Sequence, residues 1–256
     1  MIIAGNWKMH KTIGEALELV AALKQKLEKL NQETLAAVTV IVAPPYTAIN
    51  ALAKELAPAA NIKIAAQDLF WEKAGAFTGA ISASMLKEAG AQYVIIGHSE
   101  RRTIFNDTNK AVNSKIKAAL KEGLTPIFCV GETLPERESR GAIATVTEQL
   151  NLGLEGLSAE EAAKIVIAYE PVWAIGTGKT ASPSDAEEVH LAIRQLLTSK
   201  FNASTACAIS LIYGGSVKPS NARELLSQPN LDGALVGGAS LNSEDFVGII
   251  EGAFVA

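Results

Sequence analysis

Short apolar runs rich in β-branched residues recur eight times along the chain, and this repetition limits the folds available to it. They predict strands near residues 2–6, 37–43, 62–66, 92–97, 124–130, 165–169, 208–213 and 233–237. Continuous apolar runs of this length are typical of strands buried on both faces of a parallel sheet. The starts of successive strands are 25 to 43 residues apart, which leaves room for a helix in each interval.

Patterns typical of helices fill these intervals. One apolar stripe steps by four and three residues through Ala16, Val20, Leu23, Leu27 and Leu30, as on the buried face of an amphipathic helix. Ser158, Ser182 and Asn242 each have acidic residues within the next three positions, which predicts helix N-caps. Because Pro183 follows Ser182, we predict a helix over 183–199.

The alternation of strands and helices indicates an α/β fold. A βαβ series forms a parallel sheet with right-handed crossovers, and eight such units in about 250 residues favour a closed barrel over an open sheet. No proline-rich or glycine-rich linker divides the chain. We therefore expect one (β/α)8 barrel, a single catalytic domain over residues 1–256.

Composition and charge exclude several classes of protein. Lys and Arg number 23 and Asp and Glu 27, a net charge of −4, so the chain lacks the basic character of a nucleic-acid-binding domain. No apolar run reaches about 18 residues, so no membrane span is expected. Cys129 and Cys207 form no CxxC pair, and we expect neither a disulfide framework nor a zinc site. The first eight residues lack the features of a secretory leader, so the expected location is cytoplasmic.

Polar residues follow several predicted strands, at the end where barrel enzymes carry out their chemistry. They are Asn6 and Lys8 after the first strand, His98 and Glu100 after the fourth, Glu170 after the sixth, Gly214-Gly215-Ser216 after the seventh, and Gly237-Gly238 after the eighth. A buried strand delivers His98 to this face, but position alone leaves a catalytic and an ordinary polar role equally open. His10 and His190 are interpreted as ordinary polar residues.

Glu170 lies between an apolar run and a proline. A carboxylate there is costly unless it is paired or performs chemistry, and a salt-bridged structural acid is the alternative. A shielded carboxylate can take a proton from a carbon next to a carbonyl. A neutral hydrogen-bond donor must then stabilise the resulting enediolate oxygen, and His98 and Lys8 are suitable residue types.

The glycine pairs after the seventh and eighth strands indicate a phosphate site, since barrels commonly bind phosphate there. Glycine lets backbone N–H groups approach an anion closely, although a plain tight turn explains each pair taken singly. A different segment, Gly176-Thr-Gly-Lys-Thr180, ends like a P-loop. It is not one, because Trp173 occupies the position of the first P-loop glycine. We interpret it as part of a lid that excludes water.

Seven segments, taken in order, resemble triosephosphate isomerases over nearly the whole chain. They are Gly5-Asn-Trp-Lys-Met9, Gly75-Ala-Phe-Thr-Gly79, Gly97-His-Ser-Glu-Arg-Arg102, Cys129-Val-Gly-Glu132, Ala168-Tyr-Glu-Pro-Val-Trp-Ala-Ile-Gly-Thr-Gly-Lys179, Tyr213-Gly-Gly-Ser-Val217 and Asp232-Gly-Ala-Leu-Val-Gly-Gly-Ala239. Each short segment is weak alone, whereas the long one around Glu170 is highly specific.

The resemblance implies a TIM barrel that interconverts dihydroxyacetone phosphate and glyceraldehyde 3-phosphate in glycolysis and gluconeogenesis, without cofactor or metal. It implies that Glu170 is the base, that His98 is a neutral electrophile and that Lys8 supplies positive charge. Asn6 would hydrogen-bond to the substrate, and Glu100 would lie beside the site. The implied backbone donors to phosphate are Gly176, Ser216, Gly237 and Gly238.

The resemblance also implies a moving lid over the site. In the family, closure of Ala174–Gly178 links this segment to Tyr213 and Ser216. It also moves Trp173 between contacts with Tyr169 and Glu132. Exclusion of water would protect an enediol phosphate, which can otherwise lose its phosphate.

A homodimer through the Gly75–Gly79 loop is implied as well. The family usually has a glutamate after Gly79, which pairs with an arginine of the partner; here Ala80 stands in its place, and Arg101 matches the arginine. We expect Arg101 to lack its carboxylate and the dimer to be weaker than is typical. His10 replaces an asparagine common in the family, and its role stays open.

Two rival functions remain at this stage. A different phosphate-binding barrel enzyme would share the glycines after the last two strands but would not need the segment around Glu170. A non-catalytic barrel, kept as a binding or structural protein, would have lost at least one of Lys8, His98 or Glu170. All three are present.

Overall fold

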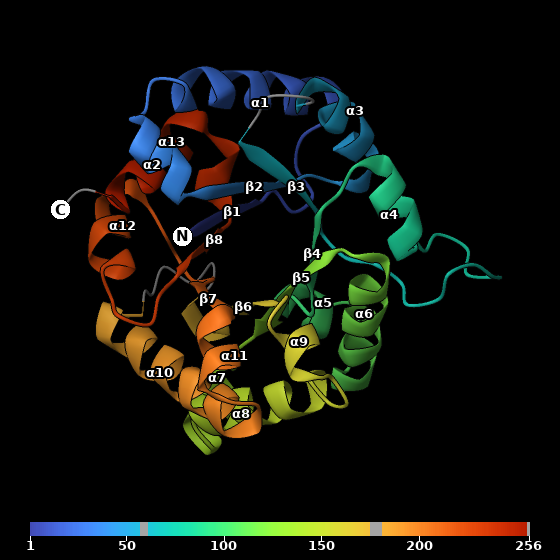
Figure 1. Ribbon diagram of the computed structural model, residues 1–256, viewed down its shortest axis with the longest axis vertical. Helices are drawn as coiled ribbons and strands as arrows, with labels where there is room; N and C mark the ends of the chain where they lie inside the picture. The colour runs from blue at the N-terminus through green and yellow to red at the C-terminus, as the bar shows by residue number, and fades with distance from the viewer. Residues whose placement is uncertain (57–60, 175–180, 255–256) are drawn as a thin grey trace.

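Eight parallel strands close into a barrel in the computed structural model, which describes residues 1–56, 61–174 and 181–254 (Figure 1). The strands are β1 (Ile2–Asn6), β2 (Thr39–Ala43), β3 (Ile62–Ala66), β4 (Tyr93–Ile96), β5 (Thr125–Val130), β6 (Val166–Tyr169), β7 (Ser210–Tyr213) and β8 (Gly233–Val236). Each pairs with its neighbour in chain order, and β1 also pairs with β8. The predicted (β/α)8 barrel is therefore confirmed.

Helices surround the strands, as Figure 1 shows. The α-helices are α1 (Ile13–Leu27), α2 (Gln32–Ala37), α3 (Tyr46–Leu56), α4 (Ala83–Ala89), α5 (Ser99–Thr103), α6 (Asn109–Glu122), α7 (Leu134–Ser139), α8 (Ala142–Gly153), α9 (Ala159–Ala162), α10 (Pro183–Lys200), α11 (Ala203–Ala208), α12 (Pro219–Leu226) and α13 (Ser243–Gly252). Two short 3-10 helices, η1 (Val172–Ala174) and η2 (Gly238–Leu241), follow the ends of β6 and β8.

Two predicted strands begin two residues too early, whereas the other predicted starts agree to within one residue. Residue 37 belongs to α2, whose N-terminus is capped by the Asn31 side chain, so β2 starts at Thr39. Residue 208 ends α11, which is capped by Asn202, so β7 starts at Ser210. In both places the apolar run extends back into a short capped helix. The apolar pattern alone does not mark where the helix ends and the strand begins.

The predicted helix starts and the first apolar stripe match the structure closely. Ser182 and Asp185 form a reciprocal capping box at the start of α10, which satisfies N–H groups that have no partner within the helix. In α1 the stripe residues Ala16, Val20, Leu23 and Leu27 are buried. The helix ends there, and Leu30, the fifth residue of the stripe, is half-buried beyond it.

The apolar core has two layers. One cluster fills the barrel interior with small and branched side chains: Ala4, Ile41, Ala43, Ala65, Ile95, Ile127, Cys129, Val166, Ala168, Ile212 and Leu235. A larger cluster lies between the strands and the helices. The interior is thus packed rather than open, and only the strand ends are free to form a site.

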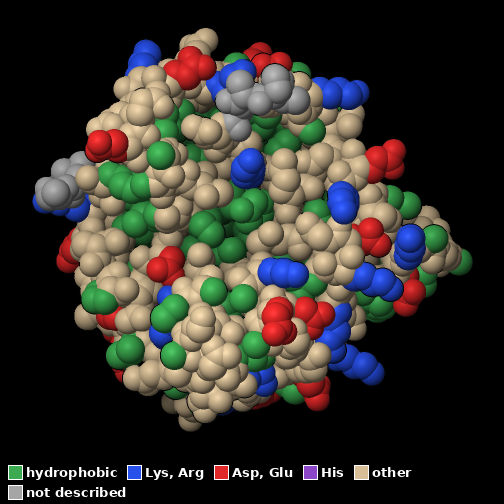
Figure 2. Space-filling view, in the orientation of Figure 1, with side chains coloured by type: hydrophobic (Ala, Val, Ile, Leu, Met, Phe, Trp, Pro, Cys, Tyr) green, Lys and Arg blue, Asp and Glu red, His purple; other side chains and the backbone are tan. Residues whose placement is uncertain are grey.

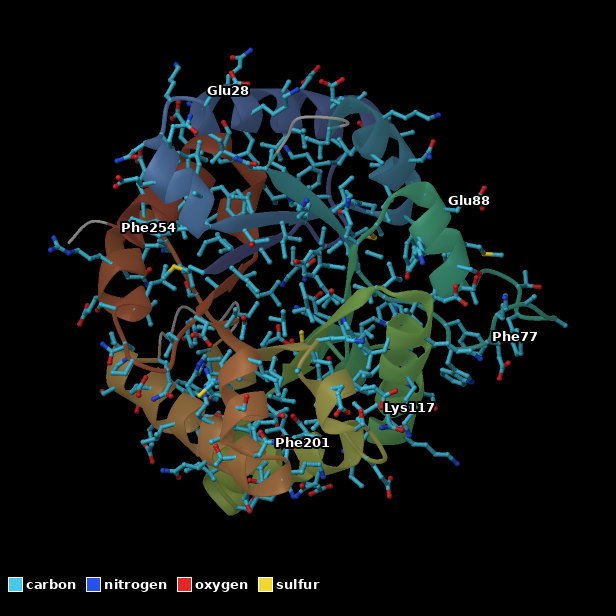
Figure 3. All side chains as sticks on the ribbon, in the orientation of Figure 1. Glu28, Phe77, Glu88, Lys117, Phe201 and Phe254 are labelled. Carbon is cyan, nitrogen blue, oxygen red and sulfur yellow. The ribbon has the colours of Figure 1, made fainter. Side chains whose placement is uncertain are left out.

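A segment between β3 and α4 projects away from the barrel, and Figure 3 labels Phe77 on it. This is the segment expected to form the dimer contact. Phe77 is 43% exposed, and its ring lies 4.6 Å from that of Phe70. An aromatic side chain held out in this way is apolar surface that a partner would cover.

The outer surface carries both signs of charge. On the face seen in Figure 2, Lys and Arg side chains lie interspersed with Asp and Glu, and hydrophobic side chains gather near the centre. None of the helices described here combines the length and the apolar character that crossing a membrane requires.

Candidate active site

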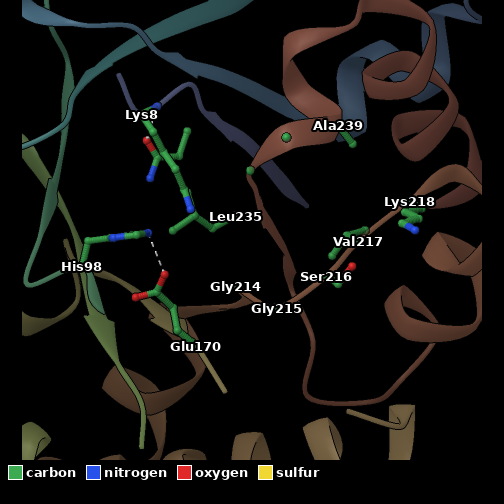
Figure 4. A pocket seen from close by; sticks show the side chains of 13 residues that line it. Lys8, His98, Glu170, Gly214, Gly215, Ser216, Val217, Lys218, Leu235 and Ala239 are labelled. Carbon is green, nitrogen blue, oxygen red and sulfur yellow. Dashed lines mark hydrogen bonds and ion pairs between the residues drawn. The ribbon is translucent and has the colours of Figure 1, made fainter. Parts of the chain in front are cut away.

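The carboxyl ends of the strands surround a cavity of about 310 Å³. Its lining residues are Asn6, Lys8, His98, Glu170, Gly214, Gly215, Ser216, Val217, Lys218, Leu235, Gly237, Gly238 and Ala239. Figure 4 shows Lys8, His98 and Glu170 at one end of this cavity and Ser216 at the other. Residues up to 233 positions apart in the chain thus meet because parallel strands all end at the same rim.

Glu170 is the buried carboxylate of the site. It follows β6, is 2% exposed, and its Oε1 atom lies 2.9 Å from Nε2 of His98. Its Oε2 atom accepts the backbone N–H of Ser99 at 3.0 Å. A Cβ atom on Gly214 would lie only 2.7 Å from Cγ of Glu170. The glycine after β7 therefore leaves room for the carboxylate side chain as well as for an anion.

The contacts of His98 determine which ring nitrogen carries the proton. The residue caps the N-terminus of α5, and its Nδ1 atom accepts the backbone N–H of Glu100 at 3.2 Å. A backbone N–H can only donate, so Nδ1 must present its lone pair. The proton of the neutral ring is then on Nε2, where it points toward Glu170 inside the cavity.

His98 and Glu170 influence each other's charge. Burial disfavours the charged imidazole, but the charge and hydrogen bond of Glu170 together with the charge of Glu100 outweigh burial, and the pKa of His98 is raised. Burial also disfavours the ionised carboxylate, but the interaction with His98, the backbone N–H of Ser99 and the charge of Lys8 together outweigh this and lower the pKa of Glu170. In the free site Glu170 is therefore ionised, as a proton acceptor must be.

Lys8 is held in place from three sides. Its Nζ atom lies 2.8 Å from Oε1 of Glu100, and its backbone N–H donates to the side chain of Asn6 at 3.1 Å. The side-chain amide of Gln67 donates to the carbonyl of Lys8 at 2.8 Å. These bonds hold Lys8 at a positive φ of 51°, a strained conformation for a non-glycine residue that is common at functional sites.

The other end of the cavity is lined by backbone. It comprises Gly214–Ser216 after β7 and Gly237–Gly238 after β8, as the sequence predicted. Gly176 lies outside the described residues. Four further lining residues were not predicted as site residues: Val217, Lys218, Leu235 and Ala239. Three of these directly follow the glycine segments, so proximity in sequence was an available signal, whereas Leu235 is indistinguishable from any other buried strand residue.

Trp173 lies next to the site, on η1. Its indole N–H donates to Oε1 of Glu132 at 2.8 Å, so of the two positions expected for Trp173 the structure has the one on Glu132. The hydroxyl of Tyr169 donates to the same carboxylate oxygen at 3.2 Å. Arg137, which the sequence analysis missed, pairs with it at 3.1 Å and lies over the Trp173 ring.

The expectation that Arg101 lacks a carboxylate is wrong. Its Nε atom lies 3.0 Å from Asp68 and 3.3 Å from Asp107. Lys115, which is 2% exposed, pairs with the same two acids at 2.7 and 2.6 Å. Two cations and two anions thus form a cluster. It neutralises Arg101 without a carboxylate at position 80. Since Arg101 belongs to α5, the cluster also anchors the helix that His98 caps.

No group of three or more His, Cys, Asp or Glu side chains suitable for a metal ion occurs among the described residues.

Comparisons with known proteins agree with this arrangement. A family model described as triosephosphate isomerase matches residues 1–253. The chain is 50% identical to the triosephosphate isomerase of Trichlorobacter lovleyi and 51% identical to that of Moorella thermoacetica, in each case over 249 residues that cover 97% of both chains. A crystal structure of triosephosphate isomerase from Bartonella henselae superposes with a TM-score of 0.86 at 42% identity, covering 98% of both chains. The chain therefore belongs to the triosephosphate isomerase family.

Proposed function

We propose that Glu170 is the base of this isomerase and moves a proton between neighbouring carbons of dihydroxyacetone phosphate and glyceraldehyde 3-phosphate. The observation that carries this proposal is the buried Glu170 carboxylate 2.9 Å from Nε2 of His98 in a cavity on the barrel rim that both residues line. When substrate binds, this contact opens, and a substrate carbonyl then presents its oxygen to His98 and the adjacent carbon to Glu170. The proton taken from one carbon is returned to the other, and His98 relays the hydroxyl proton between the two oxygens, which interconverts ketone and aldehyde.

His98 and Lys8 stabilise the intermediate in this proposal. Transfer of a proton to Glu170 leaves negative charge on the substrate oxygens, and the Nε2–H of His98 is oriented to donate to one of them. Lys8 adds a positive charge at the same end of the cavity. Asn6 orients Lys8 and hydrogen-bonds to substrate, and Glu100, paired with Lys8, fixes the position of its ammonium group.

The phosphate of the substrate binds at the glycine end. Backbone N–H groups of Ser216, Gly237 and Gly238 approach it without obstruction from side chains, and Gly176 is proposed as a further donor. Gly238 is the first residue of η2, a helix of only four residues. Closure of Ala174–Gly178 is proposed to exclude water while the intermediate exists.

The wider setting follows from the family. We propose glycolysis and gluconeogenesis as the pathways, the cytoplasm as the compartment, and the whole of residues 1–256 as one catalytic unit. A homodimer through the Gly75–Gly79 loop is proposed from the exposed Phe77 on the projecting segment. Sedimentation at micromolar protein concentration tests it, and a species of monomer mass alone contradicts it.

A coupled assay of glyceraldehyde 3-phosphate isomerisation tests the catalytic proposal. Glu170→Gln keeps the shape of the side chain but removes the base, and we expect activity to fall by about a hundredfold or more. Glu155→Gln, an exposed position far from the cavity, is the matched control and should retain full activity. A folded parent without activity would favour the non-catalytic barrel, and an active Glu170→Gln variant would assign the base elsewhere.

A further inference from the structure

His190 is completely buried on α10, although it belongs to neither end of the cavity. Its Nδ1 atom lies 3.0 Å from the carbonyl oxygen of Asn230. A carbonyl only accepts, so Nδ1 carries the proton and Nε2 does not. Nε2 has no hydrogen-bond partner among the described residues. Burying an imidazole nitrogen that makes no hydrogen bond costs free energy. A leucine at the same position of the helix would avoid this cost.

Asn230, which accepts the hydrogen bond from His190, is itself held in place by hydrogen bonds. Glu187, one turn earlier on α10, accepts the backbone N–H of Asn230 at 3.0 Å and its side-chain amide at 2.6 Å. Asn230 is therefore fixed from the same helix on both sides. The imidazole ring is held in one orientation by this contact, as a phenylalanine or leucine at the same position would not be.

The fixed ring packs against two tyrosines at the ends of neighbouring strands. Its centroid is 5.9 Å from that of Tyr169, with the planes nearly perpendicular, and 6.5 Å from that of Tyr213. These two tyrosines are register partners in β6 and β7. Tyr169 directly precedes Glu170, and Tyr213 directly precedes the Gly214–Ser216 segment.

Tyr213 in turn shapes the glycine end of the cavity. A Cβ atom on Gly215 would lie only 2.2 Å from the Tyr213 hydroxyl oxygen. The phenol therefore lies directly on the backbone of Gly215, and a shift of the ring would change where that backbone runs. The contacts form a continuous series from Glu187 through Asn230, His190 and Tyr213 to the cavity wall.

We propose that His190 is a positioning residue of this isomerase: it holds the ring of Tyr213 against Gly215 and so sets the backbone on which the substrate phosphate binds. The proposal rests on the phosphate site proposed above. It assigns His190 to substrate affinity rather than to proton transfer, because the ring touches no reacting group. Its loss should therefore raise KM and leave kcat nearly unchanged.

His190→Ala tests this with two readouts, steady-state kinetics and competitive inhibition by inorganic phosphate. We expect KM and the inhibition constant of phosphate to rise together by about tenfold, close to the upper end of what one aromatic contact contributes, with kcat within about threefold. Ile193→Ala is the matched control: Ile193 is buried on the same helix and faces α8. It should lower thermal stability without changing either constant.

A purely structural role predicts a different result. If His190→Ala loses stability and active protein while KM and the phosphate constant stay at the parent values, the proposal is overturned. If that variant does not fold, Glu187→Ala releases Asn230 without emptying the core. It should raise both constants by about threefold, an effect consistent with loss of one buried hydrogen bond, while the exposed Glu188→Ala leaves them unchanged. Unchanged constants in Glu187→Ala would then overturn the proposal.

Gly215→Ala separates this proposal from the phosphate site itself. The added methyl group displaces the Tyr213 ring or the loop, so phosphate inhibition should weaken. Weakening in Gly215→Ala without any effect in the His190 and Glu187 variants refutes the role of His190 alone. No weakening in any of them refutes the phosphate site at Gly214–Ser216.

Discussion

Acidification should destabilise this protein through His190, and the structure gives the size of the effect. Burial lowers the pKa of His190 from 6.5 to about 4. The unfolded chain therefore takes up a proton at this residue at a pH where the folded chain does not. Stability is lost as the pH falls below about 6.5, and the loss from this residue is complete near pH 4 because both states are then protonated.

Each pKa unit corresponds to about 1.4 kcal/mol, so the full loss is about 3 kcal/mol. This is a large part of the roughly 5–15 kcal/mol that stabilises a typical domain. Groups that face His190 also affect its pKa. The Asn230 carbonyl and the carboxylates of Glu187 and Asp232 raise the pKa and partly offset burial, whereas Arg194 lowers it. The rings of Tyr169 and Tyr213, which also face His190, are neutral in acid as any phenol is, and burial raises the pKa of both further.

Urea unfolding of the parent and of His190→Phe, at one fixed protein concentration, measures the effect. Other carboxylates titrate in both proteins, so the difference between the two isolates His190. Between about pH 7 and about pH 4.5, the parent should lose about 2 kcal/mol more than the variant. Parallel losses in the two proteins would show that His190 is protonated in the folded state and would refute the reasoning.

Three further predictions concern other contacts. Lys115→Met removes the buried cation that Asp68 and Asp107 share, leaving them the more exposed Arg101, and should lower the unfolding free energy by about 3–5 kcal/mol; a urea midpoint near that of the parent contradicts it. Gly214→Ala places a methyl group against Glu170 and should reduce kcat by about tenfold or more, whereas wild-type turnover would refute the steric argument. Ala80→Glu should tighten a dimer by less than about tenfold, since Arg101 already has two carboxylates; a larger gain in sedimentation would show that those acids do not satisfy it.

Much of the fold was predictable because its signals are local. Eight apolar runs and the caps at Ser158, Ser182 and Asn242 depend on neighbouring residues only, and these elements occur where they were expected. The errors at β2 and β7 have the same origin. The apolar pattern does not change where a short helix such as α2 or α11 passes into a strand, so the boundary is not encoded in periodicity.

The candidate site was predictable in its membership but not in its contacts. Every predicted site residue within the described part of the chain lines the cavity, except Glu100, which pairs with Lys8. The roles of Gln67 and Arg137 were not detected. Gln67 bonds a carbonyl 59 residues away and Arg137 pairs with a carboxylate on the preceding loop. Nothing about a glutamine or an arginine in isolation indicates such partners.

The sequence by itself determined the number and order of the strands, the helices between them, and the polar and glycine residues at the strand ends. Only the tertiary structure decided which nitrogen of His98 carries the proton, that Asp68 and Asp107 neutralise Arg101, and that His190 is buried between two tyrosines. The physical reason is the distance along the chain between the residues that determine each feature. Burial patterns repeat along the chain and can be read locally, but charge and protonation depend on atoms that strand register brings within about 3 Å. Ser99 and Glu170 are 71 positions apart in the chain, and the barrel joins them by a single hydrogen bond.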